Sequence, residues 1–276
     1  MQESIRDWLV QAGFPEEIEL APLGSGLGST TLWTFVPAPN AAPLLARVFR
    51  EGGERVANRE YLAMRAAAAH GIPVPTVVTR GVVSNRPLLV TTFAAGTPVS
   101  QALVEDPRRV HELGVRMGEA MGRLHQVVAP EGLVPRADAW IDRGGPALAP
   151  IRPLLATIPN GDRLLHLDYH PDNVLVDGRT VTAIIDWENT MAGPPHIDLA
   201  RTRAILHAAK VSGRLPEGQQ VAVDRLVDGI VQGHATVIGP DPHPALSAAW
   251  ASAMTADDLA GHLGKPGSWI TEAFLD

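Results

Sequence analysis

The sequence predicts an α+β protein in which a strand-rich first third precedes a mainly helical remainder. Short β-prone runs bounded by Gly, Pro, Asn and Ser occupy the chain up to residue 93, and segments with helical apolar spacing follow from residue 106. A strand, loop and hairpin pattern at 164–186 interrupts the helical part. With 276 residues and 45% hydrophobic composition, the chain can bury a substantial core in one bilobal unit or in two small domains.

The first residues predict an amphipathic helix and no targeting segment. Apolar side chains recur at helical spacing with charged ones between them, in the set Ile5, Trp8, Leu9, Ala12, Glu3, Arg6 and Asp7. The longest uncharged stretch, 20–46, is interrupted by Gly, Pro, Ser and Thr and cannot be a membrane span. We therefore expect a cytoplasmic protein without a membrane partner.

A glycine-rich segment, Leu23–Ser29, lies between two β-prone runs. Its glycines remove the Cβ atom at positions where a backbone could approach phosphate groups. A glycine-rich hairpin turn explains the same pattern equally well.

The run LLARVFR at 44–50 predicts a strand that carries Arg47. The chain has two lysines, Lys210 and Lys265, and both are far downstream, so Arg47 is the candidate cation of this strand. A guanidinium is permanently charged and binds phosphate through a planar fork. An ordinary surface charge on a strand is the alternative interpretation.

A helix and a hairpin should complete the first third of the chain. The Ala-rich segment 55–70 predicts a helix, and Gly71 is a typical residue to end it. Two alternating runs, 76–83 and 87–93, flank a turn at 84–86 and predict a hairpin.

Helices dominate the prediction for the remainder of the chain. Asp106 as N-cap and Pro107 in the first turn begin a long helix. Its apolar face should be core and consists of Val110, Leu113, Met117, Met121, Leu124 and Val128. The Pro- and Gly-rich segment 130–162 predicts a surface excursion, and the sequence PPHIDLA at 194–200 begins another helix.

The densest group of polar residues lies in LLHLDYHPDNVLVDGRTVTAIIDWE, residues 164–188. This pattern places Asp168 and Asn173 on a tight loop after a strand, and Asp186 at the end of the following hairpin, close enough to share one ion. Mg²⁺ favours hard oxygen ligands and takes only one or two carboxylates from the protein. Phosphoryl transfer needs such an ion, a group that orients or deprotonates the hydroxyl, and cations at the phosphates. Taken singly, each residue also fits a local cap or Asx-turn.

Zinc is a poorer interpretation of the same segment. His166 and His170 are spaced as on a zinc-binding helix, but Pro171 breaks any helix there and the metalloprotease glutamate is missing.

The motif HLDYHPDN followed by IDWE resembles the catalytic and metal-binding loops of the aminoglycoside phosphotransferase-like family of small-molecule kinases. The resemblance extends from about Leu23 to Arg203. It implies a bilobal protein-kinase-like fold. The N-lobe, 1–95, would be a small antiparallel sheet plus a helix that binds the nucleotide, and the larger, mainly helical C-lobe, 96–276, would carry the catalytic and metal loops and the acceptor-binding region.

Two residues depart from the usual motif. Leu167 stands where the family usually has Gly, and Trp187-Glu188 replaces the Phe-Gly of protein kinases. The second departure favours the small-molecule branch.

Position by position, the resemblance implies Asp168 as the catalytic base and Asn173 and Asp186 as the Mg²⁺ ligands. His166 would be a scaffold for the loop. Asp198 would brace the catalytic loop, although a plain helix N-terminal carboxylate explains it equally well.

The resemblance also implies a set of residues that contact ATP or GTP. These are Gly24, Ser25, Gly26, Gly28, Ser29, Arg47, Glu60, Thr92, Phe93 and Ala94. Arg47 stands where the family usually has lysine and would contact the phosphates. Glu60 would pair with it, with Glu54 as a competing partner, and backbone groups around Thr92 to Ala94 would face the purine.

Net charge and composition limit the classes of partner that the protein can bind. The net charge of −7 argues against nucleic acid and is compatible with a cationic acceptor, and the lack of cysteine excludes disulfides and thiolate chemistry. Acidic residues after residue 200 could face an amine-bearing antibiotic, although solvated helix faces look the same; they are Asp224, Asp228, Asp241, Asp257, Asp258 and Glu272.

The expected activity is Mg²⁺-dependent transfer of the γ-phosphate of ATP or GTP to a hydroxyl of a small molecule. An aminoglycoside or related antibiotic is the favoured acceptor, which implies a role in antibiotic resistance. A metabolite kinase of choline, homoserine or sugar type and a catalytically silent nucleotide-binding relative are the alternatives.

Overall fold

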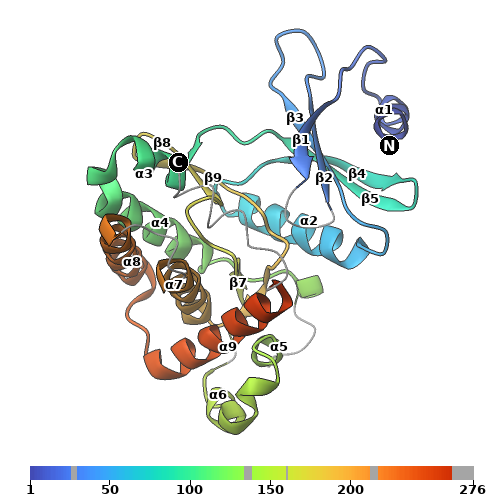
Figure 1. Cartoon of the computed structure of the whole chain (residues 1–276). Helices are drawn as coiled ribbons and strands as arrows, with labels where there is room; N and C mark the ends of the chain where they lie inside the picture. The colour runs from blue at the N-terminus through green and yellow to red at the C-terminus, as the bar shows by residue number, and fades with distance from the viewer. Residues whose placement is uncertain (26–29, 134–138, 160, 212–216, 263–276) are drawn as a thin grey trace.

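An antiparallel five-stranded sheet forms most of the N-terminal part of the chain, and helices form most of the rest (Figure 1). The computed structural model describes residues 1–25, 30–133, 139–159, 161–211 and 217–262. The strands are β1 (Ala21–Ser25), β2 (Thr31–Phe35), β3 (Leu44–Val48), β4 (Val77–Val83) and β5 (Arg86–Thr92), in the order β1-β2-β3-β5-β4. The predicted α+β class is confirmed.

Two helices cover opposite faces of this sheet. α1 (Gln2–Gln11) packs on the face that buries Leu44, Ala46 and Val48. α2 (Glu54–Ala69) lies on the face toward the helical part of the molecule (Figure 1). Because side chains alternate along a strand, Arg47 points to the α2 face while its two neighbours point into the core. The central position of β3, between β2 and β5, fixes Arg47 in the middle of the sheet.

The second half of the chain surrounds short strands with long helices. Its strands are β6 (Thr97–Pro98), β7 (Arg163–Leu165), β8 (Val174–Asp177), β9 (Thr180–Ile184) and β10 (Met191–Gly193). Its helices are α3 (Val99–Glu105), α4 (Val110–Leu124), α5 (Ala139–Asp142), α6 (Arg152–Leu155), α7 (Pro195–Val211), α8 (Glu217–Ile238) and α9 (Pro244–His262), with 3-10 turns at Pro107–Arg109, Glu131–Leu133 and Pro146–Ile151. β8 pairs with β9 and β6, and β7 pairs with β10. These two small sheets frame the loops that carry the predicted site.

Helices α4 and α8 pack unusually closely because glycines line their contact. A Cβ atom at Gly118 would lie 2.1 Å from the carbonyl oxygen of Ile230, and one at Gly233 would lie 2.1 Å from that of Val115. Side chains of any size would therefore force the two backbones apart. The close approach runs along both helices, from Gly114 against Gly229 to Gly122 against Val237 near the ends of α4 and α8.

Two predictions for the long helix need correction. The long helix does not begin at Asp106: that residue caps the 3-10 turn at Pro107–Arg109, and a separate helix, α3, precedes it. Val128 is 49% exposed, because α4 ends at Leu124 and the chain leaves the core face. A sequence pattern shows the apolar spacing but not the point at which packing ends a helix.

The segment 130–162 is more than a surface excursion. Its 3-10 turns and short helices bury large apolar side chains, which join Trp250 of α9 in a separate core; they include Trp140, Ile141, Leu148 and Leu155. Trp250 donates its indole N–H to the carbonyl oxygen of Trp140 at 2.9 Å. Frequent Pro and Gly residues therefore mark changes of direction here and not exposure. Among the described residues, no helix combines the length and apolar character needed to cross a membrane.

Candidate functional site

The loop between β7 and β8 carries Asp168 and Asn173, and its start is held by one buried carboxylate. Asp198 of α7 accepts hydrogen bonds from the backbone N–H groups of His166 at 2.6 Å and Leu167 at 2.8 Å. Leu167 has a φ of 62°, a conformation that costs a non-glycine residue energy. Its side chain is fully buried, so packing and the bond to Asp198 hold Leu here where the family usually has Gly.

Asp198 is also bound from the opposite side by His125, which in turn contacts His234. The Nε2 atom of His125 lies 3.1 Å from Asp198, and its Nδ1 atom lies 2.9 Å from Nε2 of His234. Burial alone would raise the pKa of Asp198, but the hydrogen bond from His125 and the nearby imidazoles outweigh it and lower the pKa. The carboxylate therefore stays charged, and Asp198 is a brace of the loop and not a plain helix-end carboxylate.

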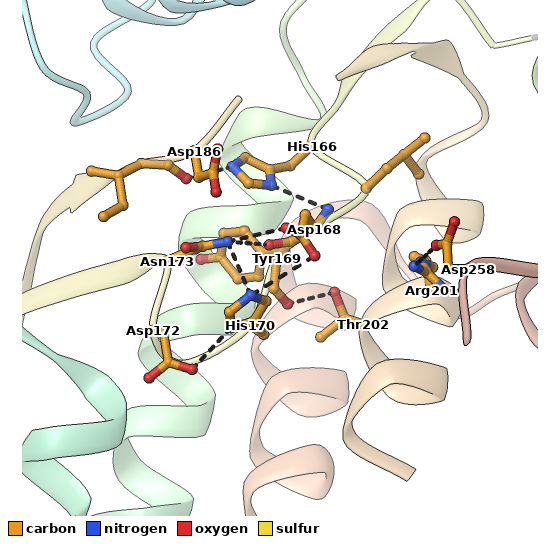
Figure 2. A network of polar contacts seen from close by, with 12 residues as sticks. His166, Asp168, Tyr169, His170, Asp172, Asn173, Asp186, Arg201, Thr202 and Asp258 are labelled. Carbon is orange, nitrogen blue, oxygen red and sulfur yellow. Dashed lines mark hydrogen bonds and ion pairs between the residues drawn. The ribbon is translucent and has the colours of Figure 1, made fainter. Parts of the chain in front are cut away.

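Asp168 projects from the loop with its side chain 27% exposed (Figure 2). Burial raises the pKa of Asp168 above its ordinary value, and the carboxylate of Asp186 adds to the rise, while the imidazole of His170 opposes it. His170 lies 3.8 Å from Asp168 and 3.3 Å from Asp172. Burial would lower the pKa of His170, but these carboxylates outweigh it and raise the pKa. Asp168 is therefore a carboxylate of increased basicity that still reaches solvent.

Asn173 is oriented by contacts of its amide nitrogen. Nδ2 donates to the backbone oxygen of Asp168 at 2.9 Å and lies 3.1 Å from Nε2 of His170. The amide oxygen has no hydrogen-bond partner among the described residues. One hard oxygen ligand is thus free at the edge of the loop.

Asp186 follows β9 and is linked by His166 to the loop between β7 and β8. The Nδ1 atom of His166 accepts from the N–H of Asp168 at 3.3 Å, so Nε2 donates to the oxygen of Ile185 at 2.9 Å. Burial lowers the pKa of His166 and keeps the ring neutral, as this pattern requires. Asp186 has a φ of 63° and a side chain 41% exposed. The link fixes the two loops relative to each other.

The donor set formed by Asn173 and Asp186 fits Mg²⁺. An amide oxygen and a partly exposed carboxylate are hard ligands, and Mg²⁺ usually takes its remaining ligands from phosphate and water. Within the described part of the chain, no three His, Cys, Asp or Glu residues are grouped as a metal site. The arrangement therefore suits an ion that arrives with a nucleotide better than a resident zinc ion.

Arg47 lies where the N-terminal sheet meets these loops and contacts three carboxylates. Nη1 donates to Glu60 at 3.3 Å, and Nη2 donates to Asp186 at 3.1 Å and to Glu188. Burial raises the pKa of Glu60 to about 7, although Arg47 opposes the rise. Arg47 is only 14% exposed and pairs with Glu60 and not with the competing Glu54, so it is not an ordinary surface charge.

The structure describes only some of the residues that are predicted to contact the purine and the phosphates. Gly24 and Ser25 end β1, whereas Gly26, Gly28 and Ser29 lie outside the described residues. Thr92 donates its N–H to the oxygen of Thr76 at 2.9 Å, and Phe93 donates to that of Pro43 at 3.0 Å. These two N–H groups are therefore unavailable to a purine. The N–H of Ala94 has no partner among the described residues, and the Phe93 side chain is 44% exposed.

Two charged residues of the site were missed as functional candidates. In the sequence, Glu188 stands out only as a departure from the motif. The spacing of residues does not predict its contact with Arg47. Arg201 of α7 is buried, and its charge acts on Asp168. Its guanidinium donates to Thr255 and to Asp258 of α9, and Figure 2 shows the pair with Asp258. A sequence signal existed for Arg201, because it lies on the same helix face as the buried Ile197 and Ile205.

The acidic residues considered for an acceptor do not form one wall. Asp258 pairs with Arg201, whereas Asp224 pairs with Lys210 and Asp241 accepts from the N–H of His243. Glu272 lies outside the described residues.

The sequence matches the Phosphotransferase enzyme family (APH) over residues 19–225, which is more than half of the chain. The chain belongs to this family. Membership in the APH family confirms the resemblance carried by HLDYHPDN and IDWE.

Among APH relatives, the aminoglycoside 3'-phosphotransferase of Streptomyces fradiae is 34% identical over 154 residues, which cover 48% of this chain and 58% of that protein. The chain thus matches little more than half the length of this relative.

Solved structures of similar proteins show the same fold over nearly the whole chain. Aminoglycoside phosphotransferase APH(4)-Ia superposes with a TM-score of 0.70 at 16% identity, covering 99% of this chain and 97% of that chain. A thermostable mutant of that enzyme in ternary complex with ADP and hygromycin B superposes with a TM-score of 0.58 at 17% identity, covering 93% and 98%. Macrolide 2'-phosphotransferase MphH from Brachybacterium faecium has a TM-score of 0.57 at 17% identity, covering 98% and 96%. The predicted kinase-like fold is confirmed.

Proposed function

We propose that the protein transfers the γ-phosphate of ATP or GTP to a hydroxyl of a small molecule, with Mg²⁺. The observation that carries this proposal is the grouping of Asp168, Asn173 and Asp186 on two loops that His166 links. The neighbouring cation Arg47 joins this group from the opposite lobe. These are the parts that phosphoryl transfer requires.

In this proposal Asp168 accepts or orients the proton of the attacking hydroxyl. Asn173 and Asp186 would hold Mg²⁺, which when bound would neutralise charge on the phosphates. Arg47 donates to phosphate oxygens, and the buried Glu60 holds its guanidinium in place. Residues 1–95 would serve as the nucleotide-binding lobe and residues 96–276 as the catalytic and acceptor-binding lobe.

The acceptor is the less constrained half of the proposal. Relatives named for aminoglycosides and macrolides support an antibiotic acceptor, and resistance to that antibiotic would follow. A metabolite kinase is the second candidate, because the acidic residues considered for a cationic acceptor do not form one wall. The intact set of Asp168, Asn173 and Asp186 argues against a catalytically silent protein.

Substrate-dependent release of ADP or GDP tests both candidates. The panel should contain aminoglycosides, macrolides, amino alcohols, amino acids and sugars, each with Mg²⁺ and with each nucleotide. Turnover of an antibiotic supports the first candidate and turnover of a metabolite the second. Lack of nucleotide binding would contradict the kinase proposal altogether.

Replacing Arg47 should weaken nucleotide binding. Arg47→Ala removes a cation whose hydrogen bonds to phosphate are charge-assisted, and we expect affinity for ADP to fall about 10- to 100-fold. Arg47→Lys keeps the charge, loses the planar fork and should fall between the wild type and Arg47→Ala. Titration calorimetry with ADP and GDP measures both variants. An unchanged affinity in Arg47→Ala would show that another group binds the phosphates.

Replacing His170 should move the acid limb of the pH–rate profile to higher pH. The imidazole of His170 opposes the rise in the pKa of Asp168, so His170→Asn should raise that pKa further. A base acts in its deprotonated form, and activity is lost as pH falls through its pKa. The profile of kcat/KM for the acceptor measures the shift. Burial also raises the pKa of Glu60 to about 7, and His170 is not among the groups that shift it. If the acid limb of the profile does not move in His170→Asn, the limb belongs to Glu60 and not to Asp168.

A further inference from the structure

The Nη2 atom of Arg47 contacts two carboxylates. It donates to Asp186 at 3.1 Å and also to Glu188, while Nη1 is held by Glu60. Both contacts at Nη2 come from the segment after β9 and cross between the two parts of the molecule. The guanidinium face that would meet phosphate is therefore already occupied.

We propose that Glu188 is a resident counter-ion of Arg47, which the phosphates of a nucleoside di- or triphosphate replace on binding. This inference rests on the nucleotide site proposed above. Glu188 is then a positioning residue: it keeps Arg47 extended toward the metal loop and leaves when phosphate arrives.

Burial and the proposed metal site together decide which carboxylate leaves. The Glu60 side chain is 5% exposed and comes from the middle of α2, so it cannot gain solvation by rotating away. Asp186 is 41% exposed, but in the proposed site it holds Mg²⁺ beside the phosphates, so Glu188 is the carboxylate left to move. The Glu188 side chain is 31% exposed, and an ion pair at such a site is worth little once solvent can replace the partner. Arg59 donates to the backbone oxygen of Glu188 at 3.1 Å, which holds the main chain while the side chain rotates. The exchange therefore needs one side-chain movement.

The carboxylates around Arg47 favour the movement of Glu188 away from it when phosphate binds. Three carboxylates surround one guanidinium, and together they would repel a polyphosphate. Rotation of Glu188 into solvent relieves part of that repulsion and frees Nη2 for a charge-assisted bond to phosphate. Glu188 thus competes with phosphate for Arg47 whether or not a metal is present.

The test is the affinity for ADP measured by titration calorimetry in EDTA, which excludes a metal contribution. Glu188→Gln and Glu188→Ala should each bind ADP about tenfold more tightly than wild type, since one charge-assisted contact no longer competes. Glu54→Gln is the matched control, because it removes an exposed carboxylate at the start of α2 and should leave the affinity unchanged. Two substitutions at Glu188 guard against a folding defect in either one.

The opposite results are equally informative. Unchanged or weaker binding by both Glu188 variants in EDTA would overturn the exchange. Binding that weakens only with Mg²⁺ would assign Glu188 to the metal and would also overturn it. If wild type binds neither ADP nor GDP with or without Mg²⁺, the nucleotide site itself is wrong, and this result is distinct from a failure of Glu188 alone.

Discussion

Replacing Asp168 with Asn should lower turnover by about 10² to 10⁴, the usual contribution of a general base. Asparagine has nearly the same shape, but its amide cannot accept the hydroxyl proton. The loop should keep its conformation, because its bonds to Asn173 and His166 at 2.9 and 3.3 Å use backbone atoms of Asp168. Nucleotide affinity should therefore be largely kept. Initial rates of ADP or GDP release and calorimetric titration measure the two quantities.

Asp177→Asn is the matched control for this experiment. Asp177 lies at the exposed end of β8, the strand that follows the loop of Asp168, and its replacement removes the same charge without touching the site. We expect near-normal turnover from it. Near-normal turnover from Asp168→Asn would show instead that Asp168 is not the base. Loss of both turnover and nucleotide binding would indicate a disturbed loop.

The short polar motifs of the site were predictable because they depend on local chain geometry. A strand, a tight loop and a hairpin must return the chain on itself, which places Asp168 and Asn173 near Asp186 whatever packs around them. The predicted contact between Arg47 and Glu60 came from the resemblance and is present at 3.3 Å. The ion pair needs only that α2 covers the sheet face opposite α1.

Contacts between distant segments were not predictable from spacing. Glu188 reaches Arg47 across 141 positions of the chain, and no periodic pattern relates the two. The frequent Pro and Gly residues of the segment 130–162 predict an exposed excursion, although its apolar side chains pack against Trp250. The positive φ of Leu167 also depends on partners that come from α7. Each of these features is fixed by tertiary packing that local propensity does not encode.

The contacts of Arg47 and Arg59 connect the N-terminal part of the chain to the segment after β9. Both arginines come from the N-terminal part, and both bond to the segment 186–188 that follows β9. A nucleotide that binds Arg47 would break the contact between Arg47 and the Glu188 side chain. The bond from Arg59 to the backbone oxygen of Glu188 would remain. In the proposed exchange the metal ligand Asp186 keeps its contact with Arg47, and only the side chain of Glu188 moves. Nucleotide binding would therefore change the contacts of the segment 186–188 without releasing Asp186.

The largest effect on stability should come from Asp198. Its carboxylate is fully buried and collects three donors: the backbone N–H groups of His166 and Leu167 and the Nε2 atom of His125. Asp198→Ala would leave these donors buried without a partner, and breaking a buried charged contact costs about 3 to 5 kcal/mol. The free energy of unfolding, measured with urea near pH 7, should fall by that amount. The exposed Asp228 of α8 is the matched control, since its change to Ala should stay within about 0.5 kcal/mol.

The pH dependence separates the charge of Asp198 from simple loss of packing. The pKa of Asp198 is lowered in the folded protein, so its stabilising contribution is complete above the ordinary aspartate pKa of about 4 and is lost as pH falls through the lower folded value. The difference in stability between wild type and Asp198→Ala should therefore be constant near neutral pH and should narrow in acid. A difference below about 1 kcal/mol at pH 7 would mean that other contacts hold the catalytic loop. A large difference that does not narrow in acid would mean that lost packing, and not the carboxylate charge, accounts for the effect.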